Sequence, residues 1–422
     1  MSLKRELGLF SLTLYGIGII LGAGIYALIG VGAGLAGNML WLAFLVSALI
    51  AIFTGLSYAE LSGMFPKDAA EYNYTKQAFS NNLLSFLVQW VLLIGLIIGG
   101  ATVALGFGGY FHSAFGVEQQ TAAYGLIVCM MILNYLGIKE SATFNNFASI
   151  IEVVGLILVV AVVFLLSGSA KEFNLLEMPP NGFNGIFAAI SVIFFAYIGF
   201  ESVANLSEEV KDSRKIVPKA LILSLLISTA LYILVSIAAV SEVGWKTLSE
   251  SKAPLTAVVS KTLGNYSVAL SFIALFATAN TVLVMLVVSS RILYGMANNG
   301  TLPKIFSRIG ERGTPYYSVL LIGLGTLVAA SIGNIRTIAQ ITDMGIFLAY
   351  LVVNLSLIAL CSKNNIKRTF TSPRIFGQPI LAYLGALSAL FMLFVFEESV
   401  WAIEAVLITA GAVVFLANKT KV

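Results

Sequence analysis

The segment from Leu14 to Gly37 is apolar enough to cross a membrane, but its middle is poor in helix-forming residues. Between Gly16 and Tyr26, four of the eleven residues are Gly, and each Gly inside a helix costs roughly 1 kcal/mol relative to Ala. In hydrocarbon an unpaired peptide group is expensive, so a broken helix is tolerated only where it lines a cavity or is buried in protein. A Gly-interrupted span therefore predicts a binding site near the middle of the membrane.

Apolar runs recur along the whole chain of 422 residues. The composition is 59% hydrophobic and only 10% charged, whereas soluble domains have about 25% charged residues. Because about 20 apolar residues suffice to cross a bilayer, we predict an all-α polytopic membrane protein with about 12 transmembrane helices and no separate soluble domain. The predicted spans are 8–37, 39–65, 83–111, 121–138, 144–168, 183–208, 217–241, 266–297, 316–333, 337–361, 375–396 and 399–417.

The basic residues favour one orientation in the membrane. With the N-terminus inside, 18 Lys and Arg residues fall in cytoplasmic segments and five in outer loops, while Arg291 stands at a span end. The five outer residues are Lys171, Lys246, Lys252, Lys261 and Arg336. Since positive residues collect on the cytoplasmic side, we expect a multi-pass protein of the cell membrane with both termini in the cytoplasm. This topology also explains the net charge of +4, so we expect the lipid bilayer and no nucleic acid as a partner.

Patterns that would indicate an enzyme are missing from the sequence. The two cysteines, Cys129 and Cys361, do not have the spacing of metal ligands, and the one histidine is His112. Gly22-Ala23-Gly24 is not a dinucleotide-binding fingerprint, because no third Gly falls at the required spacing. We therefore expect no enzymatic activity, no cofactor and no metal site.

A second interruption lies in the sixth predicted span, where Gly199 is followed by the carboxylate of Glu201. Since five spans separate the two breaks, we expect a five-plus-five repeat, and an odd number of spans gives the second repeat the opposite topology. Matched breaks in inverted halves indicate a transporter site. The predicted parts are 1–168 for helices 1–5, 169–361 for helices 6–10, and 362–422 for two extra C-terminal helices. The alternative is that these glycines only let helices pack closely.

The two breaks also suggest a substrate. A broken helix exposes amides at the start of one half and carbonyls at the end of the other. Exposed amides at a helix N-terminus suit a carboxylate, and carbonyls suit an ammonium group. A site bounded by both fits a zwitterionic α-amino acid.

Several motifs, in order, resemble those of the amino acid–polyamine–organocation (APC) superfamily. The resemblance extends from the start of the chain to about residue 361. The matching segments are Gly18–Tyr26, Tyr58–Leu61 with Phe65-Pro66, Glu71–Tyr74, Gly137–Ala142 with Asn145-Asn146, Phe194–Val210, Ile216–Ala220, and Ser290–Ala297 with Leu302-Pro303. The resemblance implies the fold of the bacterial leucine transporter, with substrate between helices one and six. By position, it implies that the amides near Gly22, Ala23 and Gly24 hold the substrate carboxylate. The carbonyls of Phe195, Ala196 and Ile198, with Ile20, would then meet the amino group or its flank.

Several polar residues within the spans are further candidates. Many members of the superfamily have a lysine at the position of Glu152, where it resembles a stand-in for a sodium ion. An acidic residue here could carry a proton or bind a cation, or it could be a neutral Glu bonded to a neighbouring span. Glu201 either supports the helix break or contacts substrate. Asp343 is expected at a solvated helix end. Thr281 either faces the site or bonds across helices.

Together these features predict a secondary transporter of amino acids that works by alternating access. We expect proton coupling through Glu152, with sodium as the alternative. The residues around both breaks are mostly apolar, which favours neutral or apolar L-amino acids. The rival within transporters is a carrier or exchanger of cationic amino acids or polyamines that uses Glu152 and Glu201 as counter-charges. Rivals from other classes are a channel, which would need a polar pore lining, and a membrane amino acid sensor.

Overall fold

The computed structural model describes residues 4–167, 174–179, 182–251, 254–264, 268–331, 335–363, 366–396 and 398–419. Within these ranges the regular secondary structure is helical, apart from two isolated β-bridges. The expected boundary between the two repeats at 168–169 lies outside the described residues, as do Lys171 and Lys252.

The helices follow the predicted spans closely. The first part of the chain contains α1 (Leu9–Ala36), η1 (Gly37–Met39), α2 (Leu40–Met64), α3 (Ala70–Phe79), α4 (Asn82–Phe115), α5 (Gln119–Leu136), α6 (Ile138–Ala161) and η2 (Val162–Ser167). The second part contains α7 (Gly182–Ile193), η4 (Phe194–Tyr197), η5 (Phe200–Glu209), α8 (Ser213–Glu250), α9 (Pro254–Leu263), α10 (Val268–Asn298), η7 (Lys304–Ser307), α11 (Tyr316–Ala330), α12 (Ile335–Leu360), α13 (Ile380–Leu393) and α14 (Glu398–Lys419).

Nine segments of the described chain are long and apolar enough to cross a membrane. Helices satisfy every backbone group internally, which is what hydrocarbon requires of a spanning segment. The prediction of an all-helical polytopic membrane protein is thus confirmed. Two further apolar helices, α11 and α13, are shorter, with 15 and 14 residues. The count of twelve spans and the inverted repeat stay predictions.

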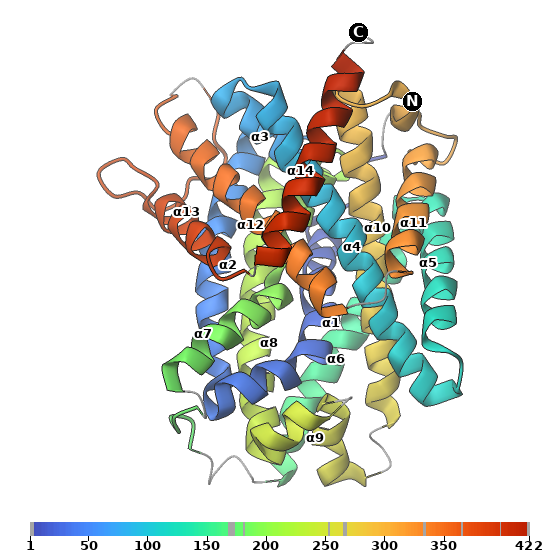
Figure 1. Ribbon diagram of the computed structural model, residues 1–422, viewed down its shortest axis with the longest axis vertical. Coiled ribbons are helices and arrows are strands. Elements are labelled where there is room, and N and C mark those ends of the chain that lie inside the picture. Colours follow the sequence, from blue (N-terminus) through green and yellow to red (C-terminus); the bar gives the residue numbers. More distant parts are fainter. Residues whose placement is uncertain are drawn as a thin grey trace.

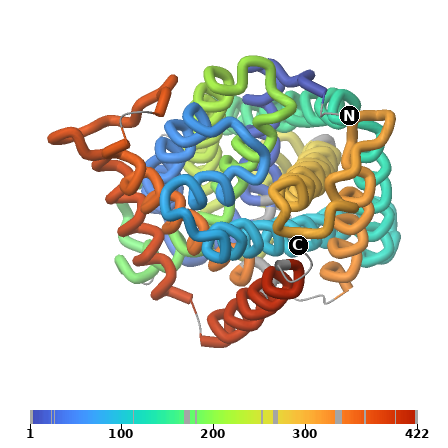
Figure 2. Tube along the Cα trace, turned by 90° about the horizontal axis from the view of Figure 1, so that it is seen from above, coloured from blue at the N-terminus to red at the C-terminus, as the bar shows by residue number. Residues whose placement is uncertain are grey.

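The helices form a bundle with two distinct ends. Figure 1 shows α3 and the last turns of α14 at one end of the bundle and α9 at the opposite end. We call the end with α3 the inner side, since the charge bias predicts that it faces the cytoplasm. Helix α1 packs against α6, α8 and α10, and α4 packs against α10 and α12. Viewed along the bundle, α13 and α14 lie at its periphery (Figure 2).

Candidate functional site

The first break lies in the middle of α1. Gly22 has the non-helical angles φ −30° and ψ −111°, so α1 consists of two helical pieces. A Cβ atom at Gly22 would collide with the hydroxyl group of Thr281 on α10, and one at Gly18 would collide with the side chains of Asn280 and Ser149. The Thr281 hydroxyl lies 3.2 Å from the carbonyl oxygen of Gly18, within hydrogen-bond distance. The glycines of this segment therefore serve both the break and the close contact with α10.

The second break lies between η4 and η5. Ile198 is extended, and Gly199 has φ 114°, a conformation that residues with a side chain rarely adopt. The carboxylate of Glu201 accepts the N–H of Gly199 at 3.0 Å and the hydroxyl of Tyr350 at 2.6 Å. Glu201 thus holds the freed backbone at the break and connects it to α12. Both predicted breaks are present.

The two breaks touch each other. A Cβ atom at Gly24 would lie 2.5 Å from the Cα atom of Ala196, so only Gly permits this approach. The hydroxyl of Tyr232 on α8 joins the two breaks, because it bonds to the carbonyl oxygen of Ile20 and, at 2.9 Å, to that of Ala196. One O–H group has one proton to donate, so it cannot fully satisfy both carbonyls at once.

A cavity lies where the breaks meet. Its volume is about 10 Å³, which is room for about one water molecule. The residues that line it are Ile19, Ile20, Gly24, Val103, Phe195, Ile198, Thr281 and Met285. An amino acid would fit only if these elements moved apart, and Met285 and Phe195 are the large side chains that would have to turn.

The structure brings four of the eight predicted substrate-binding residues together around this cavity: Ile20, Gly24, Phe195 and Ile198. Two others lie at its edge, Gly22 against Thr281 and Ala196 against Gly24. The side chain of Ala23 is not among those described. Glu201 does not line the cavity and supports the break instead.

Three contributors to the site did not stand out in the sequence. Tyr232 lies 36 residues after Ala196 and 212 after Ile20 in the chain, so no local motif connects it to the breaks. Val103 and Met285 line the cavity from α4 and α10. In the sequence they look like any other apolar residue of a span.

Glu152 lies in α6 and is completely buried. Neither of its carboxylate oxygens has a hydrogen-bond partner among the described residues. The described residues therefore show no hydrogen bond of the kind expected for a neutral Glu152 bonded to a neighbouring helix.

A buried ion pair lies on the inner side of the cavity. Arg291 on α10 and Glu209 at the end of η5 have fully buried side chains, and their atoms meet at 3.1 Å (Nη2–Oε1) and 3.2 Å (Nε–Oε2). Arg291 also donates to the side chains of Asn134 and Ser290, each at 2.9 Å. The pair joins the element after the second break to α10.

Two further contacts hold η5 on the inner side. The side chain of Asn205 donates to both carboxylate oxygens of Glu71 on α3, at 3.0 Å. The loop before α3 supplies Asp68, whose Oδ1 accepts the N–H of Glu208 at 2.9 Å. Burial, and then the nearby carboxylates of Glu208 and Glu209, raise the pKa of Asp68 above its ordinary value. The inner half of the sixth span is thus fixed by polar contacts along its length.

Asp343 corrects one expectation. It was predicted at a solvated helix end, but only 4% of its surface is exposed. The physical reason is that α12 is enclosed by other helices, chiefly α4, α13 and α3. Phe347, one turn further along the same face, also contacts Phe194 with ring centroids 4.5 Å apart.

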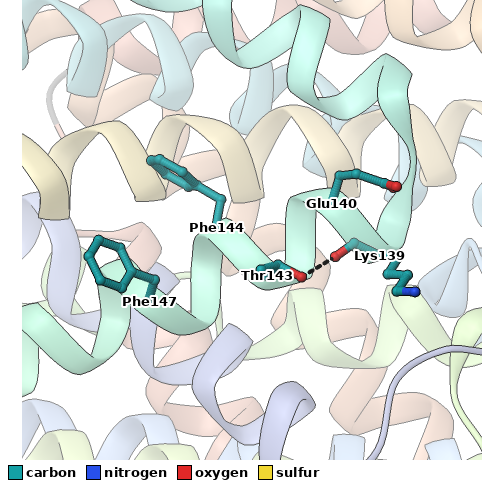
Figure 3. A pocket seen from close by; sticks show the side chains of 5 residues that line it. All are labelled: Lys139, Glu140, Thr143, Phe144 and Phe147. Carbon is teal, nitrogen blue, oxygen red and sulfur yellow. Dashed lines mark hydrogen bonds between the residues drawn. The ribbon is translucent and has the colours of Figure 1, made fainter.

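A larger hollow lies elsewhere, on the surface of α6. Figure 3 shows the five side chains that line it, from Lys139 to Phe147, all on one stretch of this helix. The hydroxyl of Thr143 in this stretch donates to the carbonyl of Lys139 at 2.8 Å. Because one helix face supplies all its walls, we regard it as a surface groove rather than a substrate site.

Comparison with known proteins agrees with this geometry. A family model described as amino acid permease matches residues 7–416. The branched-chain amino acid permease BcaP of Bacillus subtilis (strain 168) is 31% identical, over 93% of this chain and 88% of its own length. The methylthioribose transporter of the same organism is 29% identical, over 100% and 94%. Cationic amino acid transporter 4 of Mus musculus is 31% identical, over 85% of this chain and 60% of its own length. A membrane-embedded cavity between two broken helices, in a chain matched almost from end to end, leads to one assignment: this protein belongs to the amino acid permease family of the APC superfamily.

Proposed function

We propose that the chain is a secondary active transporter that carries amino acids across the cell membrane by alternating access. The observation that carries the proposal is the cavity between the two breaks, which backbone and apolar side chains of both broken segments line. Inverted five-span repeats, 1–168 and 169–361, would rock around this point.

Labelling of the two termini from each side of the membrane tests the expected cytoplasmic orientation.

The chemistry of the breaks favours an α-amino acid. Amides near Gly22 and Gly24, at the break of α1, would suit the substrate carboxylate. The carbonyls of Ile20 and Ala196 share the single proton of Tyr232, so one of them is left to accept from the substrate ammonium. The apolar lining favours neutral or apolar side chains.

The substrate is tested by thermal shift, because a ligand that binds only the folded protein raises its unfolding midpoint. The screen contains the twenty amino acids, putrescine and methylthioribose. Leucine or alanine should stabilise the protein most, and the matching amines without a carboxylate should bind far less. Stronger stabilisation by putrescine would favour a polyamine carrier. A response to methylthioribose alone would contradict the carboxylate site.

A second candidate is a carrier of cationic amino acids. It is favoured by the buried carboxylate of Asp343, whose Oδ1 has no hydrogen-bond partner among the described residues and which the proposed preference for neutral side chains does not use.

For energy coupling we propose Glu152 as the proton carrier. It is buried, and neither of its oxygens has a hydrogen-bond partner in the part of the chain that the structure describes. A carboxyl in this position could load a proton from one side of the membrane and release it to the other as the cavity opens in turn.

The test of this coupling is Glu152→Gln, which mimics the protonated form. The variant should keep substrate binding and exchange in liposomes but lose uptake driven by a proton gradient. Unchanged proton-driven uptake would remove Glu152 from the mechanism. Loss of sodium-driven uptake would instead identify Glu152 as a cation ligand.

A further inference from the structure

Asp343 is a buried carboxylate that the proposed transport cycle leaves unused. It lies within α12, and its Oδ1 has no hydrogen-bond partner among the described residues. No ion pair or hydrogen bond of Asp343 is recorded in the part of the chain that the structure describes. A charge in the membrane interior is costly unless it pairs, and such residues commonly mark a substrate or ion path. The missing partner therefore points to a cation that arrives from outside the chain.

The direction of Asp343 follows from helix geometry. Residues four and seven positions further on, Phe347 and Tyr350, lie on the same face of a helix. Both of these rings contact Phe194, with centroids 4.5 Å and 6.4 Å apart. Asp343 is thus on the face of α12 that packs against η4, and the residue after Phe194, Phe195, lines the cavity.

A flexible side chain separates the cavity from this part of α12. Met285 lines the cavity. Its side chain and that of Thr342 on α12 both lie next to Gly99 of α4, which has no side chain of its own. A Cβ atom at Gly99 would be 3.5 Å from the terminal methyl of Met285 and 3.5 Å from the methyl of Thr342. Met is unbranched and adapts to different shapes, so rotation of Met285 would join the cavity to the turn that contains Asp343.

We propose that Asp343 determines specificity by receiving a second, distal ammonium group of the substrate, as in lysine. The apolar stem of such a side chain would lie along Met285 and Phe195, while its charged end would reach the carboxylate. This inference rests on the proposed function, because it requires an amino acid in the cavity between the breaks.

The chain offers a matched control in Glu404 of α14. Glu404 is also buried, at 2% exposed, and its Oε1 also has no partner. It lies against Gly345 on a different face of α12, beside the carbonyl of Val91, and α14 lies at the periphery of the bundle (Figure 2). Its substitution changes an unpartnered membrane carboxylate without touching the cavity.

The experiment compares lysine with norleucine, which has the same stem but no distal amino group. Affinities are measured by calorimetry on purified wild-type protein, Asp343→Asn and Glu404→Gln. The wild type should bind both ligands. Asp343→Asn should lose at least tenfold affinity for lysine and keep its norleucine affinity within about twofold, and Glu404→Gln should change neither.

Different outcomes separate the two proposals. If the wild type binds norleucine but not lysine, or if Asp343→Asn weakens both equally, the subsite is refuted while amino acid transport stands. If neither ligand binds the wild type, the subsite is refuted, and the proposed function fails too only if leucine and alanine also leave the unfolding midpoint unchanged. Should Asp343→Asn fail to fold, the wild type is treated with a carbodiimide, and modification of Asp343 is followed by mass spectrometry. Lysine should slow this modification and norleucine should not; equal rates would overturn the subsite.

Discussion

The buried ion pair between Arg291 and Glu209 gives a direct test of what holds η5 against α10. Both side chains have no exposed surface. Removing one member of a buried pair leaves an unpaired charge and typically costs about 3–5 kcal/mol of the free energy of unfolding. We therefore expect Glu209→Gln and Arg291→Met each to lower stability by an amount in this range.

The double variant, Glu209→Leu with Arg291→Met, makes the test specific. Replacing a whole buried pair by apolar groups is often neutral or even stabilising by about 1–4 kcal/mol. Here the gain is reduced, because Asn134 and Ser290 lose the donor that reaches them at 2.9 Å. An unsatisfied buried polar group costs about 1–3 kcal/mol, so the double variant should be close to the wild type and more stable than either single variant.

Stability would be measured by unfolding in mixed micelles titrated with sodium dodecyl sulfate. Lys215 and Asp212, whose surface pair is 3.1 Å long with side chains 68% and 56% exposed, provide the control. Surface pairs contribute roughly 0–1 kcal/mol, so Asp212→Asn should change little. The argument from burial would be refuted if each single variant lost less than about 1 kcal/mol of the free energy of unfolding. It would also be refuted if the double variant were less stable than both single variants.

Three further predictions concern the breaks and the inner loop. Gly24→Ala should lower the free energy of unfolding by about 1–3 kcal/mol and also weaken substrate binding, because the new Cβ atom meets the backbone of Ala196. Gly106→Ala is the control, because no described atom lies within 4 Å of its Cβ position. Tyr232→Phe should weaken substrate binding as well as stability. Tyr197→Phe, which removes a 3.0 Å bond to the carbonyl of Phe44 and leaves the carbonyls of Ile20 and Ala196 bonded to Tyr232, should affect only stability. Equal affinities in both variants would count against the bridge. The raised pKa of Asp68 means that the folded protein holds this proton more tightly than the unfolded chain, so stability falls as pH rises from the ordinary value to the raised one. In Asp68→Asn, the free energy of unfolding should decrease less steeply with pH than in the wild type. An unchanged slope would show that other groups cause the decrease.

Much of the fold could be predicted from sequence because the membrane restricts the choices. A span of apolar residues must be helical, and glycines mark where that helix is interrupted. The breaks at Gly22 and Gly199 were therefore predictable. The helices α3 and α9 were not, because neither is long and apolar like a membrane span.

The site was predictable only where its residues lie in the breaks themselves. Ile20, Gly24, Phe195 and Ile198 line the cavity as expected from their positions. Tyr232 was missed because its contacts depend on how α8 packs against two distant segments. The burial of Asp343 was mispredicted for the same reason, since position along a span does not tell which face of the helix meets a neighbour.

The same packing connects the cavity to the inner side. The end of η5 and the residues after it are hydrogen-bonded to the start of the chain. The N–H of Leu7 donates to the carbonyl of Glu209 at 3.0 Å, and the N–H of Lys211 donates to the carbonyl of Leu7 at 2.9 Å. These bonds and the ion pair of Glu209 all involve residues 209–211. In the proposed cycle, opening towards the inner side would require this short segment to separate from its partners.

A substrate can favour that separation only through a difference in affinity between the two states. The cavity of about 10 Å³ must widen to hold an amino acid, and widening moves η4, which carries Phe195 and Ala196. Because η4 leads through Gly199 into η5, the movement in the proposed cycle reaches Glu209. A difference of about 3 kcal/mol between two states shifts their equilibrium by roughly 100-fold, at 1.4 kcal/mol per factor of ten. In the proposed cycle, substrate binding therefore has to offset the cost of leaving Arg291 and Glu209 without each other.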